Sequence, residues 1–450
     1  MGFKNDFLWG TATASYQIEG AAHEGGRGKS VWDIYCEEGR ARDGATGDVA
    51  CDHYHRWRED VGILSDLGGN AYRFSISWSR IIPEGTGRVN PEGIKFYSDL
   101  IDALLEKGIT PFITLYHWDL PYALAIRGGW RNPESPAWFE EYTRLVAKSF
   151  GDRVKNFFTF NEPQCFIGYG YRFGYQAPGL CLSDIETLPM AHNVLKAHGR
   201  AVSALKEIIP DCRVGFAPTG TPSLPATEKP EDIEAARSRY FSIEPNNWSW
   251  SVVFWSDPVL LGHYPEDDPE FKKIAHNLPA DYEKDLPLIS TPTDYYGQNI
   301  YQGAVCRKGA NGIESVPRPQ GASKTGADWA ITPEALYWSP KFLYERYKLP
   351  IIITENGMSC HDTVSLDGKV HDPNRIDFLH RYLRNLKRAA DENIPIDGYM
   401  LWSILDNFEW QSGYNERFGI VYVDYSTGER IKKDSFEWYR CVIAQNGANL

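Results

Sequence analysis

The chain contains two stretches of the same type: VKNFFTF at 154–160, followed by Asn161-Glu162-Pro163, and PIIIT at 350–354, followed by Glu355-Asn356-Gly357. Each stretch is a short apolar, aromatic or β-branched run, which is typical of a parallel strand buried on both faces. In a barrel of alternating strands and helices, the carboxyl ends of the strands meet on one face. We therefore expect Glu162 and Glu355 to face the same cleft.

Eight stretches of this kind occur along the chain, and helical stretches with 3.6-residue spacing separate several of them. The candidate strands are 7–13, 71–76, 110–115, 154–160, 213–217, 294–298, 350–354 and 398–403, and the clearest helical patterns lie at 91–106, 136–150 and 377–393. Eight strands, mostly followed by helices, predict an α/β fold. The predicted architecture is a closed (β/α)8 TIM barrel rather than an open doubly wound sheet.

The domain organisation follows from the absence of a break in the sequence. No low-complexity linker or change of composition divides the 450 residues, so we expect residues 1–450 to form a single domain with elaborated βα loops. The stretch 220–292 is long for one crossover between strands. We expect extra helices or an insertion at the rim of the barrel there.

Composition and charge limit the partners. Hydrophobic residues make up 42% of the chain, and the formal net charge is −13. An acidic protein is a poor partner for nucleic acid or for an anionic membrane surface. No stretch reaches the roughly 18 apolar residues of a spanning helix. We expect no signal peptide, reduced thiols for the eight scattered cysteines, and a cytoplasmic location. The oligomeric state is left open.

Three other motifs are set aside. Gly28-Lys29-Ser30 lacks the earlier glycine of a phosphate-binding loop, where His23 stands instead. His53 and His55, two positions apart, are interpreted as having no nearby carboxylate or cysteine partner, so we expect them to be structural and expect no metal. No Gly-x-Ser-x-Gly elbow is present, so a serine hydrolase would have no obvious nucleophile.

Polar and aromatic residues stand at the ends of seven of the predicted strands. They are Gln17 and Glu19 with the first strand, Arg73 with the second, His117 and Trp118 with the third, Asn161 and Glu162 with the fourth, Asn299 and Tyr301 with the sixth, Glu355 with the seventh, and Trp402, Glu409 and Trp410 with the eighth. The polar groups offer paired donors and acceptors suited to sugar hydroxyls, and tryptophan can supply an apolar floor. Two carboxylates across such a cleft can cleave a glycosidic bond, one as acid and the other as nucleophile or base.

The chain resembles the family 1 glycoside hydrolases, the β-glucosidase family, nearly from end to end. The resemblance is carried by FLWGTATASYQIEG at 7–20, by both glutamate motifs and by the segment from Trp402 to Trp410. It implies that Glu162 is the acid/base and Glu355 the nucleophile. It further implies that Gln17, His117, Asn161, Glu409 and Trp410 hold the sugar, that Trp402 lies beneath it, and that Arg73, Asn299 and Tyr301 orient the nucleophile. Trp329 resembles the tryptophan on the leaving-group side, and Trp118 and Phe418 are also expected to contact substrate.

The resemblance implies a retaining hydrolysis through a covalent glycosyl-enzyme, without a metal or organic cofactor. The expected substrates are small carbohydrates with terminal non-reducing β-D-glucosyl residues, such as cello-oligosaccharides or aryl and alkyl β-glucosides. Galactosides and fucosides stay candidates because the pocket of this family tolerates changes at the fourth hydroxyl. The leaving-group side is expected in the loops at 172–187 and 304–330, and the balance of hydrolysis and transglycosylation is left open.

Two alternatives compete with this interpretation. A 6-phospho-β-glucosidase typically has a serine where Glu409 stands and a Lys/Tyr pair a little later, which Glu416-Arg417-Phe418 lacks. A carboxylate at that position would repel a phosphate. The second alternative is a barrel that binds β-linked sugars without cleaving them, but such relatives have lost a glutamate and both are present here.

Overall fold

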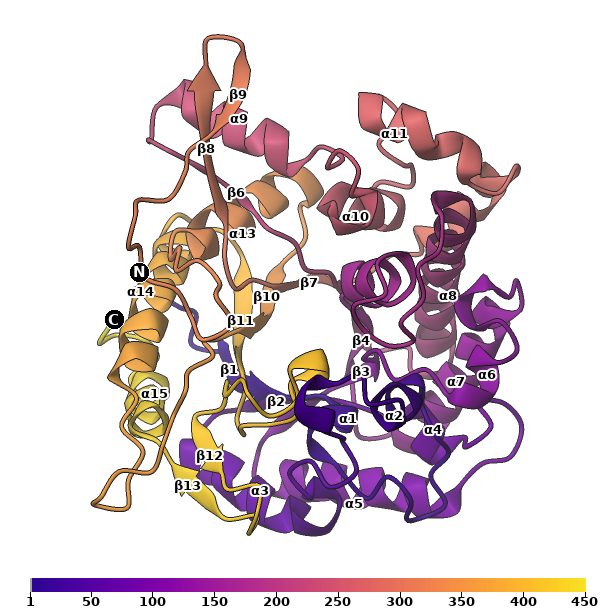
Figure 1. Ribbon diagram of the computed structural model, residues 1–450, viewed down its shortest axis with the longest axis vertical. Coiled ribbons are helices and arrows are strands. Elements are labelled where there is room, and N and C mark those ends of the chain that lie inside the picture. Colours follow the sequence, from indigo (N-terminus) through magenta and orange to yellow (C-terminus); the bar gives the residue numbers. More distant parts are fainter. Residues whose placement is uncertain (1) are drawn as a thin grey trace.

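The computed structural model describes residues 2–450, and its centre is a closed barrel of eight parallel strands (Figure 1). The barrel strands are β1 (Leu8–Ala12), β2 (Ala71–Ser75), β3 (Thr110–Tyr116), β4 (Asn156–Asn161), β5 (Arg213–Ala217), β7 (Tyr295–Asn299), β10 (Ile351–Asn356) and β11 (Ile396–Trp402). Neighbouring strands around the barrel follow the order β1-β11-β10-β7-β5-β4-β3-β2. The predicted (β/α)8 barrel is confirmed, and each strand bound lies within two residues of the predicted one.

The barrel forms because its strands are apolar on both faces. In β10 every residue from Ile351 to Asn356 is buried, and in β2 all five residues are buried. The inward faces contribute side chains such as those of Phe112 and Phe158, whose ring centroids lie 6.2 Å apart. Parallel strands with helices on the outside require this pattern, since neither face of the sheet meets water.

Helices surround the barrel as the outer layer (Figure 1). The longer ones are α3 (His53–Leu67), α5 (Pro91–Glu106), α7 (Ser135–Phe150), α8 (Asp184–Ile208), α13 (Ala335–Tyr347), α14 (Pro373–Asp391) and α15 (Asp434–Ala444). The bounds predicted for α5 are confirmed, and α7 begins one residue earlier than predicted. The start of α14 was predicted four residues too late, because Pro373 belongs to its first turn, where proline is compatible with a helix.

The remaining short helices lie mostly between strand ends and these longer helices. They are α1 (Ser15–Ile18), α2 (Val31–Glu37), α4 (Trp78–Ile81) and α6 (Tyr122–Ala125), the 3-10 helices η1 (Arg42–Gly44), η2 (Gly129–Arg131) and η7 (Trp410–Ser412), and the π-helix η3 (Gln164–Arg172). The π-helix is notable for its position, since it follows Glu162 almost directly. Helices of this type occur frequently at functional sites.

The insertion expected within 220–292 is confirmed. It contains β6 (Ser223–Pro225), α9 (Pro230–Tyr240), η4 (Trp248–Trp250), α10 (Val252–Leu260), α11 (Pro269–Ile274), η5 (Ala275–Asn277), η6 (Tyr282–Asp285) and α12 (Leu286–Ile289). Strand β6 pairs with the hairpin of β8 (Ala304–Gly309) and β9 (Gly312–Ser315), which projects from the barrel beside α9 (Figure 1).

The first and last strands close the barrel. Leu8 to Ala12 of β1 pair with Gly398 to Trp402 of β11 in parallel register, and both chain ends lie on the same side of the molecule (Figure 1). A small antiparallel ribbon of β12 (Val421–Val423) and β13 (Arg430–Lys432) follows β11. Within residues 2–450, no helix combines the length and apolar character needed to cross a membrane.

Candidate active site

The carboxyl ends of the barrel strands open into a cleft of about 640 Å³. Ten of the residues predicted from the sequence line it: His117, Trp118, Glu162, Tyr301, Trp329, Glu355, Trp402, Glu409, Trp410 and Phe418. The other four, Gln17, Arg73, Asn161 and Asn299, are fully buried beneath them and hydrogen-bond to lining residues. The structure therefore brings the fourteen residues predicted to act in catalysis or to contact substrate to one face of the barrel.

Glu162 follows the last residue of β4 and has a left-handed backbone conformation with φ of 43°. This conformation is uncommon for a residue with a side chain, and such residues cluster at functional sites. The Glu162 carboxylate accepts hydrogen bonds from Asn299 Nδ2 (2.7 Å) and from the thiol of Cys165 (3.2 Å). Burial, and then the charge of Glu355, raises the pKa of Glu162 to about 7. Glu162 therefore holds a proton at a pH where an ordinary glutamate is ionised.

Glu355 lies in β10 and has different partners. Arg73 Nη1 donates to its Oε1 at 2.7 Å, and the Tyr301 hydroxyl donates to its Oε2 at 2.7 Å. Burial raises the pKa of Glu355, while Arg73 and Tyr301 act in the opposite direction. Since a guanidinium and a hydroxyl donor both contact Glu355 and neither contacts Glu162, Glu355 is the carboxylate of the pair that ionises first.

Two buried amides and Arg73 link the two glutamates. Asn161 Oδ1 accepts from Arg73 Nη2 (2.6 Å) and from Asn299 Nδ2 (3.0 Å), and Thr354 Oγ1 donates to Asn299 Oδ1 (2.6 Å). With its oxygen so occupied, Asn161 donates through Nδ2 to His117 Nε2 at 2.9 Å. Burial, with the nearby charge of Arg73, lowers the pKa of His117 well below its usual value. His117 is therefore a neutral imidazole whose proton is on Nδ1.

Glu409 lines the cleft, and the buried Gln17 supports it from behind. Gln17 Nε2 donates to Asn407 Oδ1 (3.0 Å), to the Phe408 carbonyl (2.8 Å) and to Glu409 Oε2 (3.2 Å). Burial, followed by the charges of Glu355 and Glu416, raises the pKa of Glu409 to about 8. Within residues 2–450, Gln17 Oε1 has no hydrogen-bond partner, so this amide keeps an acceptor beside the cleft.

Aromatic rings cover the floor of the cleft. The rings of Trp118 and Trp410 lie 4.6 Å apart, and the imidazole of His117 stacks near Trp402 at 5.8 Å and near Trp410 at 5.9 Å. Farther out, Trp329 contacts Tyr301, with ring centroids 5.1 Å apart, and Phe418 at 5.8 Å. Rings in these positions present apolar faces beside polar edges, the combination that suits a sugar.

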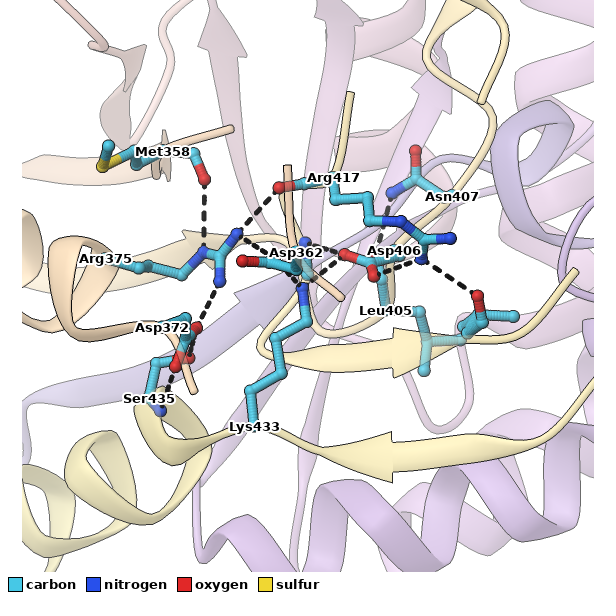
Figure 2. A network of polar contacts seen from close by, with 12 residues as sticks. Met358, Asp362, Asp372, Arg375, Leu405, Asp406, Asn407, Arg417, Lys433 and Ser435 are labelled. Atoms are coloured by element: carbon cyan, nitrogen blue, oxygen red, sulfur yellow. Dashed lines mark hydrogen bonds and ion pairs between the residues drawn. The ribbon is translucent and has the colours of Figure 1, made fainter. Parts of the chain in front are cut away.

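A buried ionic network includes Asp406, three residues before Glu409 in the sequence (Figure 2). It combines three carboxylates with three cations: Asp362, Asp372, Asp406, Arg375, Arg417 and Lys433. Lys433 Nζ donates to Asp406 Oδ1 (2.7 Å) and to Asp362 Oδ2 (2.5 Å), and Arg375 Nε donates to the Met358 carbonyl (3.2 Å). The network thus joins the segment after β10, which carries Glu355, to the segment after β11, which carries Glu409.

Several residues that line or support the cleft were missed by the sequence analysis. Cys165 bonds to Glu162, and Tyr169, Thr219–Thr221 and Trp250 line the cleft. Residues 219–221 follow the end of β5 closely, so the rule that strand ends converge on one face of the barrel predicts their position. Of the loops expected on the leaving-group side, 172–187 contributes Tyr175 and Gln176, and 304–330 contributes Gly326 to Trp329.

Three residues noted in the sequence have structural partners. Glu19 does not line the cleft; it accepts from Arg80 Nε (2.8 Å) and from the Tyr97 hydroxyl (2.5 Å). His53 bonds to Asp60 (2.7 Å) and His55 to Asp52 (2.6 Å). The expectation that no carboxylate lies near them was therefore wrong, because the helix that begins at His53 brings Asp60 back to it and Asp52 stands directly before that helix. Among residues 2–450, no three His, Cys, Asp or Glu side chains are grouped as metal ligands.

A (β/α)8 barrel with two buried, differently bonded glutamates in a cleft lined by aromatic rings defines the class of barrel glycoside hydrolases. Within that class, the chain belongs to glycosyl hydrolase family 1, whose sequence model matches residues 1–448. The predicted family and the predicted class of enzyme are both confirmed.

The curated relatives are similar over their whole length. Beta-glucosidase A of Thermotoga maritima is 47% identical over 449 residues, which cover 99% of this chain and 98% of that protein. A 1,4-beta-D-glucan glucohydrolase of Thermotoga neapolitana is 46% identical, with 99% of each chain covered. A bifunctional beta-D-glucosidase/beta-D-fucosidase of Bifidobacterium breve is 40% identical, again with 99% of each covered.

Solved structures agree with the curated relatives. The beta-glucosidase from Thermotoga maritima in complex with glucoimidazole has a TM-score of 0.91 at 46% identity, with 99% of each chain covered. The same enzyme in complex with deoxynojirimycin has a TM-score of 0.90 at 45% identity, also with 99% of each chain covered.

Proposed function

We propose that this chain is a retaining β-glucosidase in which Glu355 is the nucleophile and Glu162 the general acid/base. The observation that carries the assignment is the asymmetry between the two glutamates. Arg73 and Tyr301 favour the ionised form of Glu355, whereas burial and the neighbouring negative charge raise the pKa of Glu162 to about 7. Two carboxyl groups whose environments differ in this way can serve as a nucleophile and an acid.

In the first step, Glu355 attacks the anomeric carbon while Glu162 gives its proton to the departing oxygen. The glycosidic C–O bond breaks, and an ester bond forms between the sugar and Glu355. Arg73 and Tyr301 hold the attacking carboxylate in position, and the leaving group departs as a neutral alcohol. Glu162 is then an anion, and its bonds from Asn299 and Cys165 stabilise that form.

In the second step, Glu162 takes a proton from a water molecule, which attacks the anomeric carbon and displaces Glu355. The product keeps the configuration of the substrate, because two inversions have taken place. A retaining pair needs carboxyl groups roughly 5–5.5 Å apart, whereas an inverting pair needs about 6.5–9.5 Å to admit water. We predict the shorter separation for Glu162 and Glu355 when a sugar is bound.

The sugar is held by groups of matching polarity. Gln17, His117, Asn161 and Glu409 supply donors and acceptors for hydroxyls, and Trp402, Trp410 and Trp118 supply the apolar floor. Trp329 and Phe418 lie toward the leaving group. Lysine and arginine are absent from the described residues that line the cleft, and Glu409 and Glu416 both line it. A phosphate would therefore find no cation among these described residues of the cleft and would lie beside the carboxyl groups of Glu409 and Glu416, which disfavours a 6-phosphosugar.

The proposed substrates are small β-glucosides. The relatives named as glucosidases, a glucan glucohydrolase and a glucosidase/fucosidase support terminal β-D-glucosyl residues, with fucosyl residues as a second glycone. The presence of both glutamates argues against a barrel that only binds sugars. We further propose that residues 1–450 act as one catalytic domain, since β1 and β11 close the same barrel. The cytoplasmic location stays a prediction.

Chemical rescue tests the assignment of roles. Glu355→Ala should abolish turnover, and azide should restore it by taking the place of the nucleophile and forming an α-glycosyl azide. Glu162→Ala should still react with an aryl glucoside whose leaving group needs no proton, and azide should then give a β-glycosyl azide. Glu231→Ala, at an exposed position, is the matched control. If the Glu162 and Glu355 variants behaved identically with the activated substrate, the assignment of separate roles to the two glutamates would be wrong.

A further inference from the structure

A second hollow of about 260 Å³ opens beside the catalytic cleft, within the insertion between β5 and β7. The hollow is bounded by β6, the end of α9, η4 and the start of β8, and Figure 1 shows α9, β6 and β8 packed together. It shares three lining residues with the cleft: Gly220, Thr221 and Trp250. The two spaces are therefore neighbours that meet at one wall.

Trp250 is the aromatic part of that shared wall. Its indole Nε1 donates to Thr221 Oγ1 at 3.1 Å, and its ring packs against Tyr169 with centroids 5.2 Å apart. Tyr169 itself lines the catalytic cleft. The Trp250 ring is thus held by a hydrogen bond and by a ring contact while it stays partly exposed. A fixed, partly exposed indole between two spaces can stack on a sugar that spans them.

The other side chains of the hollow are mostly neutral hydrogen-bonding groups. They are Ser223, Ser242, Ser251 and Asn247, together with one cation, Arg239, and one anion, Glu244. Tyr240 also lines the hollow, but its hydroxyl bonds to Ser339 Oγ (2.8 Å) and Gln298 Nε2 (2.6 Å) in the core. Asn247 accepts from Ser249 Oγ (3.1 Å) through Oδ1, and within residues 2–450 its Nδ2 makes no hydrogen bond. Ser242 donates to the Arg239 carbonyl (2.9 Å), which leaves its oxygen able to accept. Hydroxyl and amide groups without an excess of charge suit a neutral sugar better than an anion.

We propose that this hollow binds the distal units of a β-linked gluco-oligosaccharide, so that the enzyme prefers chains of three or more sugar units over disaccharides. The proposal rests on the proposed function. Cleavage at the non-reducing end places one unit beside Glu162 and Glu355, and the next unit lies near Trp329. Further units leave the cleft across Trp250 and reach Ser242 and Asn247 in the hollow.

The test compares kcat/KM for cellotriose and cellobiose in the same enzyme preparation. The ratio of the two values does not depend on the fraction of active enzyme, so a partly misfolded variant does not distort it. We expect a ratio well above one in the wild type. Asn247→Ala and Ser242→Ala should each lower the ratio about two- to tenfold, the range for losing one hydrogen bond. Ser238→Ala, on the exposed side of α9, should leave the ratio as in the wild type.

Two results would overturn the proposal. The first is a wild-type ratio near one, or a ratio that Asn247→Ala does not change. The second is a wild-type ratio near one together with an effect of added glucose on aryl glucoside hydrolysis that Asn247→Ala removes. The hollow would then be a separate monosaccharide site. The failure of the proposed function is distinguishable, since neither cellobiose nor an aryl glucoside would then be cleaved at all.

Discussion

Replacing Tyr301 by phenylalanine removes one hydroxyl from the active site and keeps the ring. The ring is held by Trp329 and Phe418, at 5.1 and 6.0 Å, so the phenylalanine should keep the same position. The lost contact is the 2.7 Å hydrogen bond to Glu355 Oε2. A hydrogen bond to an ionised group contributes about 1.5–3 kcal/mol. At about 1.4 kcal/mol for each tenfold change, kcat/KM should fall by roughly 10- to 150-fold.

The pH profile distinguishes this cause from general damage. Because the hydroxyl favours the ionised form of Glu355, its removal should raise the pKa of Glu355. The nucleophile must be ionised, so the acid limb of the kcat/KM profile should move to higher pH while the basic limb stays in place. Tyr382→Phe, which removes the hydroxyl that donates to the Tyr301 carbonyl (2.9 Å), controls for displacement of the segment.

The reasoning would be refuted by a Tyr301→Phe enzyme whose kcat/KM lies within twofold of the wild type and whose acid limb is unmoved. The assay is hydrolysis of p-nitrophenyl β-glucoside from pH 4 to 9 under conditions where the substrate concentration is far below KM. A circular dichroism spectrum and a melting curve identical to those of the wild type would establish that the variant is folded.

Three further outcomes follow from the site. Since Glu162 must be protonated and its pKa is about 7, kcat/KM should fall above about pH 7, and this basic limb should vanish in Glu162→Gln assayed with an activated aryl glucoside. Glu409→Ala should reduce the stabilisation of the transition state for an aryl glucoside by about 2–5 kcal/mol, and the reduction should be smaller for an aryl xyloside. Efficient wild-type cleavage of a glucoside 6-phosphate would contradict this role of Glu409. Lys433→Met leaves Asp362 and Asp406 without their shared cation, so urea titration should give a free energy of unfolding about 3–5 kcal/mol lower, whereas Lys272→Met at an exposed position should change it little.

The barrel could be predicted because each strand carries its own signal. A run such as 350–354 is apolar on both faces whatever its neighbours are, and the rule that strand ends converge then places Glu162 and Glu355 together. The start of α14 was missed because its first three residues, Pro373 to Arg375, lie before the regular apolar spacing of that helix.

The supporting residues were harder to predict, because their partners are far apart in the sequence. Lys433 meets Asp362 and Asp406 across 71 and 27 positions, and no local spacing indicates such a pairing. The second hollow escaped prediction for a related reason. Trp250 and Asn247 belong to the insertion between β5 and β7, where no strand end marks the face on which a side chain lies.

The pairing of β1 with β11 has a consequence for the order in which the molecule is made. Leu8 pairs with Gly398, so these partners are 390 positions apart. At 5–20 residues per second, the ribosome delivers the second partner roughly 20–80 s after the first. During that interval β1 has an unpaired edge on the side that β11 will cover, and Gln17 lacks Asn407, Phe408 and Glu409. A nascent chain that stops before Trp402 is thus a template for pairing with other chains, rather than a weaker enzyme.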